Sequence, residues 1–96
     1  MVLHTINILP GNSAFGDCLR CAARGDTILL LGDAVYAAVD QSAACESLRA
    51  SEARVLVLDS DSAAAGLDAE SLAFPCTDMD GFVGLCEYYP RQLAWY

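Results

Sequence analysis

Hydrophobic residues along the chain occur in short runs that are separated by polar and glycine-containing segments. The first run, VLHTINIL at residues 2–9, is apolar and rich in β-branched residues, and Pro10 and Gly11 close it, as is typical of a strand that ends in a turn. Two further runs, TILLL at 27–31 and RVLVLD at 54–59, are continuously apolar, as strands buried on both faces of a sheet are. The pattern therefore predicts three buried strands.

Helix-capping residues and glycines lie between these strands. A helix is expected from a cap at Asn12 or Ser13 to about Arg24, with Gly25 as its C-terminal stop. A second, short helix is expected to begin at Asp33. The full set of helices expected between the strands covers residues 13–24, 33–39, 43–51 (weakly helical) and 60–67, the last one ended by Gly66.

The last quarter of the chain predicts a poor strand, a helix and a final strand. LAFPCT at 72–77 contains Pro75, which restricts this segment to a sheet edge or a strand end. Asp78 or Asp80 is expected to cap a helix that Pro90 ends, and QLAWY at 92–96 is expected to close the sheet. The apolar side of this helix is expected to carry Phe82, Leu85, Cys86 and Tyr89.

Strands that alternate with helices predict an α/β fold. The expected architecture has three layers, with a mostly parallel sheet flanked by helices on both faces. Residues 1–96 form one domain, because a chain of this length is able to bury a single core. Ligands and chemistry in such folds lie at the carboxyl ends of the strands.

Composition and charge narrow the functional classes. Hydrophobic residues make up 55% of the chain, which is too apolar for disorder, and thirteen acidic residues against five arginines give a net charge of −8. This surface repels phosphate backbones, so direct binding to nucleic acid is not expected. The start of the chain lacks the basic head and cleavage site of a signal peptide, and no apolar run approaches the ~20 residues of a membrane helix. We therefore expect a cytoplasmic protein, in which structural disulfides are rare.

Two of the five cysteines, Cys18 and Cys21, form a C-x-x-C motif inside the first expected helix. A redox pair would place its first thiol at the helix N-terminus, whereas Cys18 lies about a turn and a half into the helix and follows Asp17. A structural zinc site needs four ligands, and the remaining candidates, Cys45, Cys76, Cys86 and His4, are single and scattered. The residues alone therefore favour two small core residues over a dithiol or a metal site.

Other candidate chemistry is weaker. GNSAFGDC at residues 11–18 occupies the place of a phosphate loop, but Asp17 and Cys18 replace its lysine and hydroxyl residue, so no nucleotide site is expected. His4 is a candidate general base, although a strand-borne histidine is more often held by hydrogen bonds. Helix capping accounts for the aspartates that follow strands or precede helices. Four aromatic residues lie close to the C-terminus, and they are Tyr88, Tyr89, Trp95 and Tyr96. Such a cluster is typical of either a core or a subunit interface.

Several segments together resemble one family. They are LHTIN at 3–7, CLRCAARGDTILLLGDAVYAAV at 18–39, RVLVLDSDSAAAGL at 54–67, DMDGFVGL at 78–85, and the final QLAWY. In order and spacing they are similar to the TusB/DsrH family, the smallest subunit type of bacterial sulfur-relay complexes. The resemblance covers nearly the whole chain, and it implies a DsrEFH-like parallel α/β fold with a flavodoxin-like topology.

The resemblance also implies partners and a role. It implies a subunit, non-catalytic or accessory, of a heterohexamer with TusC- and TusD-like subunits, which passes persulfide sulfur to a TusE-like acceptor for 2-thiolation of the tRNA wobble uridine. The alternative within the family is a DsrH-type subunit, with DsrF- and DsrE-like partners and a DsrC-like acceptor, in dissimilatory sulfur oxidation.

In both settings the principal sulfur-bearing cysteine belongs to the D- or E-type partner. Cys18 falls on the position of a first-helix cysteine of DsrH-type chains, which makes it the candidate persulfide carrier of this chain. No metal and no organic cofactor is required. A free-standing C-x-x-C thiol oxidoreductase remains the competing hypothesis from another class.

Overall fold

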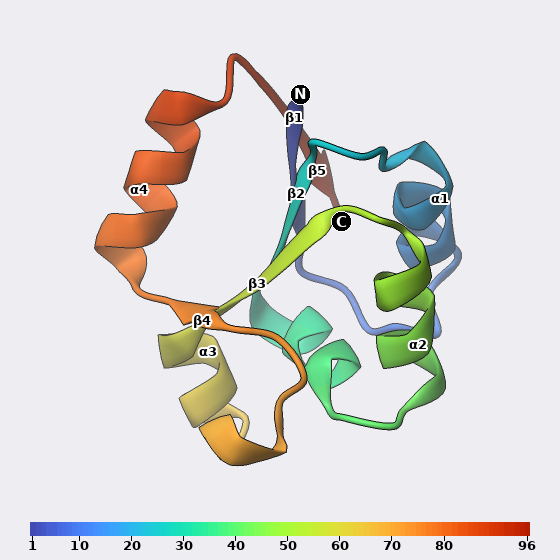
Figure 1. The fold of residues 1–96 in the computed structure, drawn as a ribbon. Helices are drawn as coiled ribbons and strands as arrows, with labels where there is room; N and C mark the ends of the chain where they lie inside the picture. The colour runs from blue at the N-terminus through green and yellow to red at the C-terminus, as the bar shows by residue number, and fades with distance from the viewer.

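The computed structural model describes all residues, 1–96, as a five-stranded sheet with helices on both sides (Figure 1). The strands are β1 (Val2–Ile6), β2 (Thr27–Leu30), β3 (Arg54–Leu58), β4 (Cys76–Thr77) and β5 (Arg91–Trp95). The helices are α1 (Ser13–Cys21), α2 (Ala43–Ala50), α3 (Asp59–Ala64) and α4 (Met79–Tyr88), with 3₁₀ turns η1 (Gly32–Ala38) and η2 (Ala69–Ser71). The α/β prediction is confirmed.

The strand order is β4-β3-β2-β1-β5, and every neighbouring pair is parallel. β2 is the middle strand, and all four of its residues are buried, as the continuous apolar run at 27–31 predicts. β5 and β4 are the two edges, and β4 has only two residues, directly after Pro75. The order differs from the flavodoxin order 2-1-3-4-5, so that part of the expected topology is wrong. The last strand here lies beside the first one.

The two faces of the sheet bury cores of different size. On the face covered by α1, α2 and η1, twelve buried residues form one cluster, in which Ile28 and Leu30 of β2 pack against Phe15 and Cys18 of α1. On the opposite face only four buried residues gather, and they are Leu3, Leu29, Leu56 and Tyr89. Most of the apolar burial that stabilises the chain therefore lies on the α1–α2 side.

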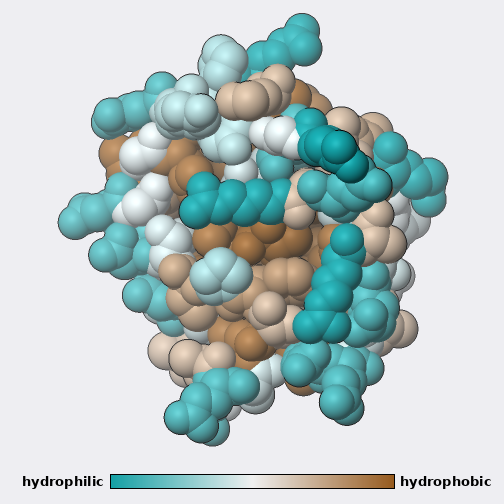
Figure 2. All heavy atoms as spheres, in the orientation of Figure 1, coloured by the Kyte–Doolittle hydropathy of each residue, from teal (hydrophilic) through white to brown (hydrophobic).

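Helix α4 runs alone along much of the second face, with α3 beyond its N-terminal end (Figure 1). None of its residues is buried, although Phe82, Leu85 and Cys86 pack partly against the small cluster. In the view of Figure 2, hydrophobic side chains gather across the middle of the molecule, over β3 and β4, inside a margin of hydrophilic ones. No helix has the length and apolar character needed to cross a membrane.

Several element ends differ from the sequence-based expectation. β1 stops at Ile6 although the apolar run continues to Leu9. α1 stops at Cys21 rather than at Arg24, because Ala22 is extended and Asp26 holds the next turn through its bond to the Ala23 amide. Gly25, with φ of 94°, therefore shapes the entry into β2 and does not end the helix.

Capping follows the expectation in part. The side chains of Asn12 and Asp78 accept hydrogen bonds from the amides of Ala14 and Gly81, so they are the N-caps of α1 and α4. Gly66, with φ of 78°, follows the end of α3 as predicted. The expected helix at residues 33–39 is a 3₁₀ helix that begins at Gly32, and Asp33 makes no capping bond there.

Candidate functional site

The C-x-x-C motif lies on the inner side and at the end of α1. Cys18 is completely buried in the large core, whereas Cys21 is the last helical residue and is exposed. Both thiols are free. The helix N-terminus lies at Ser13, too far from Cys18 for its amides to stabilise a thiolate there. The geometry thus lacks the arrangement that activates a redox dithiol.

The electrostatic surroundings of Cys18 disfavour its thiolate. Burial, together with the smaller effects of negative charge on Cys21 and Asp26, raises the pKa of this thiol from 9.0 to about 12. A nucleophilic cysteine needs the opposite environment, in which the pKa is lowered. In the chain by itself Cys18 is therefore a small apolar core residue, and the persulfide-carrier role that the resemblance implies is an untested hypothesis.

We expect the five thiols to differ sharply in reactivity. At pH 8, a pKa of about 12 in place of 9.0 leaves Cys18 about a thousandfold less thiolate, and burial blocks access as well. Iodoacetamide should therefore label the exposed Cys21 and Cys76 in the folded chain and should reach Cys18 only after unfolding. Peptide mass spectrometry during a time course measures this order. Equal rates at Cys18 and Cys21 in the folded chain would contradict the assignment.

Below α1, His4 forms a buried network with Asp26 and Trp95. His4 is 1% exposed; its Nε2 lies 2.9 Å from Oδ2 of Asp26, and its Nδ1 lies 3.1 Å from Nε1 of Trp95. An indole nitrogen only donates, so Nδ1 of His4 accepts and the ring proton lies on Nε2, which donates to Asp26. The single histidine is thus a hydrogen-bonded strand residue, as expected, and no substrate can reach it as a base.

Asp26 ties together the ends of three segments. Burial opposes its charge, but the hydrogen bond from His4 and the backbone amides of Ala23 and Val2 outweigh burial and hold the pKa of Asp26 below its ordinary 3.8. Through His4 the network reaches Trp95 in β5. The hydrogen bonds of Asp26 and Trp95 in this network were not predicted from the sequence. One sequence feature could have indicated the contact between Asp26 and His4. Asp26 directly precedes β2, and β2 pairs with β1, the strand that carries His4.

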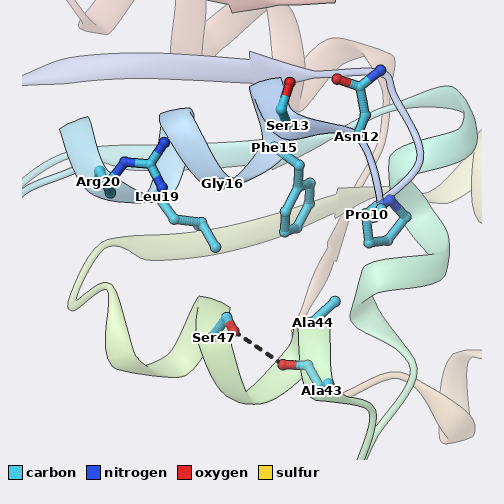
Figure 3. A pocket seen from close by; sticks show the side chains of 11 residues that line it. Pro10, Asn12, Ser13, Phe15, Gly16, Leu19, Arg20, Ala43, Ala44 and Ser47 are labelled. Carbon is cyan, nitrogen blue, oxygen red and sulfur yellow. Dashed lines mark hydrogen bonds between the residues drawn. The ribbon is translucent and has the colours of Figure 1, made fainter.

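A groove of about 520 Å³ opens between α1 and α2 (Figure 3). Phe15 and Leu19 point into it from α1, toward α2. Its charged side chain, Arg20, is held by Asp17, and Pro10, Gly11 and Asn12, in the turn before α1, also line it. The one charged residue of the lining is therefore already paired with an acid.

Other chemistry-bearing residues remain apart. No three His, Cys, Asp or Glu side chains lie close enough together to hold a metal ion. At the carboxyl ends of the strands, Oδ2 of Asp61 accepts a hydrogen bond from the Gly32 amide at 2.7 Å, which joins α3 to η1. Cys45 is buried on α2, and Cys76 is exposed on β4. Asp61 at this edge therefore serves local structure.

Solved structures share the fold. The crystal structure of the YchN protein from Escherichia coli superposes with a TM-score of 0.80 over 97% of both chains, at 15% identity. The solution NMR structure of protein Tm0979 from Thermotoga maritima gives a TM-score of 0.73 over 92% of this chain and 93% of that chain, at 22% identity. These likenesses define the class, a small α/β protein with a five-stranded all-parallel sheet.

Sequence comparison defines the family within that class. The family of DsrH-like proteins matches residues 10–92. Protein TusB of Escherichia coli K12 is 39% identical over 95 residues, which cover 98% of this chain and 100% of that protein. TusB of Shigella flexneri is 38% identical over 96 residues, with the same coverage. The chain belongs to the DsrH-like family, the TusB/DsrH type of sulfur-relay subunit.

Proposed function

We propose that this chain is an assembling subunit of a persulfide relay that serves 2-thiolation of the tRNA wobble uridine. The observation that carries the proposal is the 39% identity to protein TusB along the whole of both chains. The match runs the whole length of both chains and is not confined to one segment. It favours the TusB setting over the DsrH setting, which is the alternative function within the family.

The partners follow from the same family. The chain joins TusC- and TusD-like subunits in a dimer of heterotrimers, and the complex delivers sulfur to a TusE-like acceptor. In each transfer a carrier thiolate attacks the outer sulfur of the donor persulfide and releases the donor cysteine as a thiolate, so the transfer needs no metal and no organic cofactor. The net charge of −8 agrees with a subunit that contacts proteins and does not itself contact tRNA.

The thiols of this chain support an assembling role. Cys18 would have to leave the core to attack a persulfide, since it is fully buried and its pKa is raised to about 12. The same two observations count against a free-standing thiol oxidoreductase, which needs an accessible thiol of low pKa. Sulfur on Cys18 would require that a partner opens the α1 side of the subunit.

Co-expression with the partners tests the proposal. We expect the tagged chain to co-purify with its C- and D-type partners in equal amounts, at a mass equal to two heterotrimers by size exclusion with light scattering. The matched control is the tagged chain with the C-type partner omitted, which should give a smaller species. A chain that stays alone when both partners are present would contradict the proposal.

A further inference from the structure

The two edges of the sheet differ in how they are protected. β4, at one edge, has only two residues and directly follows Pro75, and short strands and prolines are the usual means of keeping an edge from pairing. β5, at the opposite edge, has five residues, of which four are exposed, and it pairs with β1 alone. A long unprotected edge strand is a template for pairing with another chain.

The backbone groups of β5 show which atoms are free to pair. The carbonyl oxygen of Trp95 accepts a hydrogen bond from the amide of Asn7, directly after β1, at 3.4 Å. The backbone of Trp95 and of every second residue before it therefore faces β1. The alternate residues, Gln92 and Ala94, turn their N–H and C=O groups to the outer side of the strand. Since no strand lies on that side, these four groups are without a partner in the sheet.

The positions of these groups are self-complementary. In an antiparallel pair of β5 strands with its two-fold axis at Leu93, Gln92 of each copy lies opposite Ala94 of the other. Both residues of each pair face outward, so each of the two pairs forms two backbone hydrogen bonds, four in all. An axis one residue away in either direction pairs only three of the five strand residues and forms two such bonds within the strand. The strand itself therefore selects the register at Leu93.

The side chains agree with this register. Arg91, Leu93 and Trp95 share the α1 face of the sheet, because Trp95 bonds to His4 and packs against the large core. In the two-fold pair Leu93, which is 48% exposed, lies opposite its own counterpart, and Arg91 lies opposite Trp95 of the other copy. A guanidinium over an indole is a favourable cation–π contact, and Arg91 has no ion pair within the chain.

The surroundings of β5 also suit a second copy. A hollow of about 460 Å³ lies at the start of the strand, lined by Val2, Arg91, Gln92 and Leu93. In the register at Leu93 this hollow lies beside Trp95 of the other copy and leaves room for the indole ring. Although the chain carries a net charge of −8, Arg91 is the only charged residue between positions 90 and 96. Each copy thus brings a cation to the contact, which the indole of the other copy accepts.

From these observations we propose that β5 is a docking edge for a second copy of this chain, which pairs antiparallel about Leu93 and joins the two sheets into one. The inference goes beyond the proposed function, because it is drawn from the chain's own edge strand and uses no property of the relay.

Sedimentation velocity of the chain alone tests the edge. The wild-type chain should show a monomer–dimer equilibrium that shifts toward the dimer with concentration, and further with added salt, which screens the repulsion between two chains of charge −8. Ala94→Pro removes an N–H that pairs with no strand of its own chain, so it should weaken the dimer by on the order of 100-fold through two lost bonds. Ala94→Ser keeps this N–H, and as the matched control it should associate as the wild-type chain does.

The side chain of Arg91 gives a second variant. Arg91→Gln should weaken the dimer about tenfold, because a two-fold dimer loses two cation–π contacts at once. Circular dichroism melts of each variant check that it folds.

A disulfide tests the register. Leu93→Cys brings two thiols opposite each other only with the axis at this residue, at a pair without hydrogen bonds, where side chains are close enough for a disulfide. The exposed Cys21 and Cys76 are first replaced by serine. With oxidised glutathione, Leu93→Cys should then give a covalent dimer linked through residue 93 in peptide mass spectrometry. Leu9→Cys, at a residue 54% exposed in the turn after β1, is the control and should give none.

The outcomes separate the parts of the inference. A wild-type chain that stays monomeric at every concentration, or a dimer that a folded Ala94→Pro leaves intact, overturns β5 as an edge for a second copy. A dimer that forms no cross-link through residue 93 overturns the two-fold pairing at Leu93. None of these results bears on the relay complex, which co-purification with the partners measures separately.

Discussion

Replacing Asp26 by alanine is expected to destabilise the subunit by about 3 kcal/mol, since it leaves the buried His4 Nε2–H and two backbone amides without an acceptor. For a domain of this size the loss corresponds to a fall in Tm on the order of 15 °C. Urea unfolding at pH 7 measures the free energy. Asp17→Ala is the control, because Asp17 is an exposed acid whose ion pair with Arg20 contributes about 0.5 kcal/mol or less.

The same network predicts an acid dependence of known sign. The pKa of Asp26 is lower in the folded than in the unfolded chain, so its contribution is complete above the unfolded value near 3.8 and is lost as the pH falls toward the folded value. Wild-type stability should therefore drop steeply below about pH 4, whereas Asp26→Asn should lack this component of the drop. A cost below about 1 kcal/mol for Asp26→Ala, or an unchanged acid profile for Asp26→Asn, would show that the network is not a structural centre.

Much of the fold followed from local patterns. The apolar runs at 27–31 and 54–59 became β2 and β3, Pro75 confined β4 to two edge residues, and Asp78 and Gly66 stand at helix ends. These features depend on residues that are neighbours in sequence, such as a cap and the amide it satisfies. That is why they could be predicted without an alignment.

The features of the fold and the site that could not be predicted from the sequence depend on contacts between residues far apart in the chain. The place of β5 beside β1, which gives an order other than that of flavodoxin, follows from the crossover of α4 and not from any strand motif. The link from His4 to Trp95 spans 91 positions. The burial of Cys18 depends on how α1 faces the sheet, and its raised pKa follows from that burial. Spacing alone could not separate a core thiol from an active one.

Sulfur transfer through the reconstituted complex is expected to need this chain but not its Cys18. Within the assembled complex, the carrier thiols meet one another at an effective concentration in the millimolar range. When the subunits are separate at micromolar concentration, sulfur transfer should therefore be slower by on the order of 100-fold. Omission of the chain should cause this loss, whereas Cys18→Ala, a small change in a core position, should keep the rate within about twofold. Persulfide appearing on the acceptor, followed by thiol trapping, measures the rate.

The location of the sulfur tests the central claim most directly. The complete complex would be loaded with isotopically labelled persulfide, quenched with an alkylating agent, and digested for peptide mass spectrometry. We predict label on the D-type partner and on the acceptor, with Cys18 and Cys21 of this chain unlabelled. Label that enters Cys18 and leaves it at the rate at which the acceptor gains sulfur would contradict the account and would make this subunit a carrier.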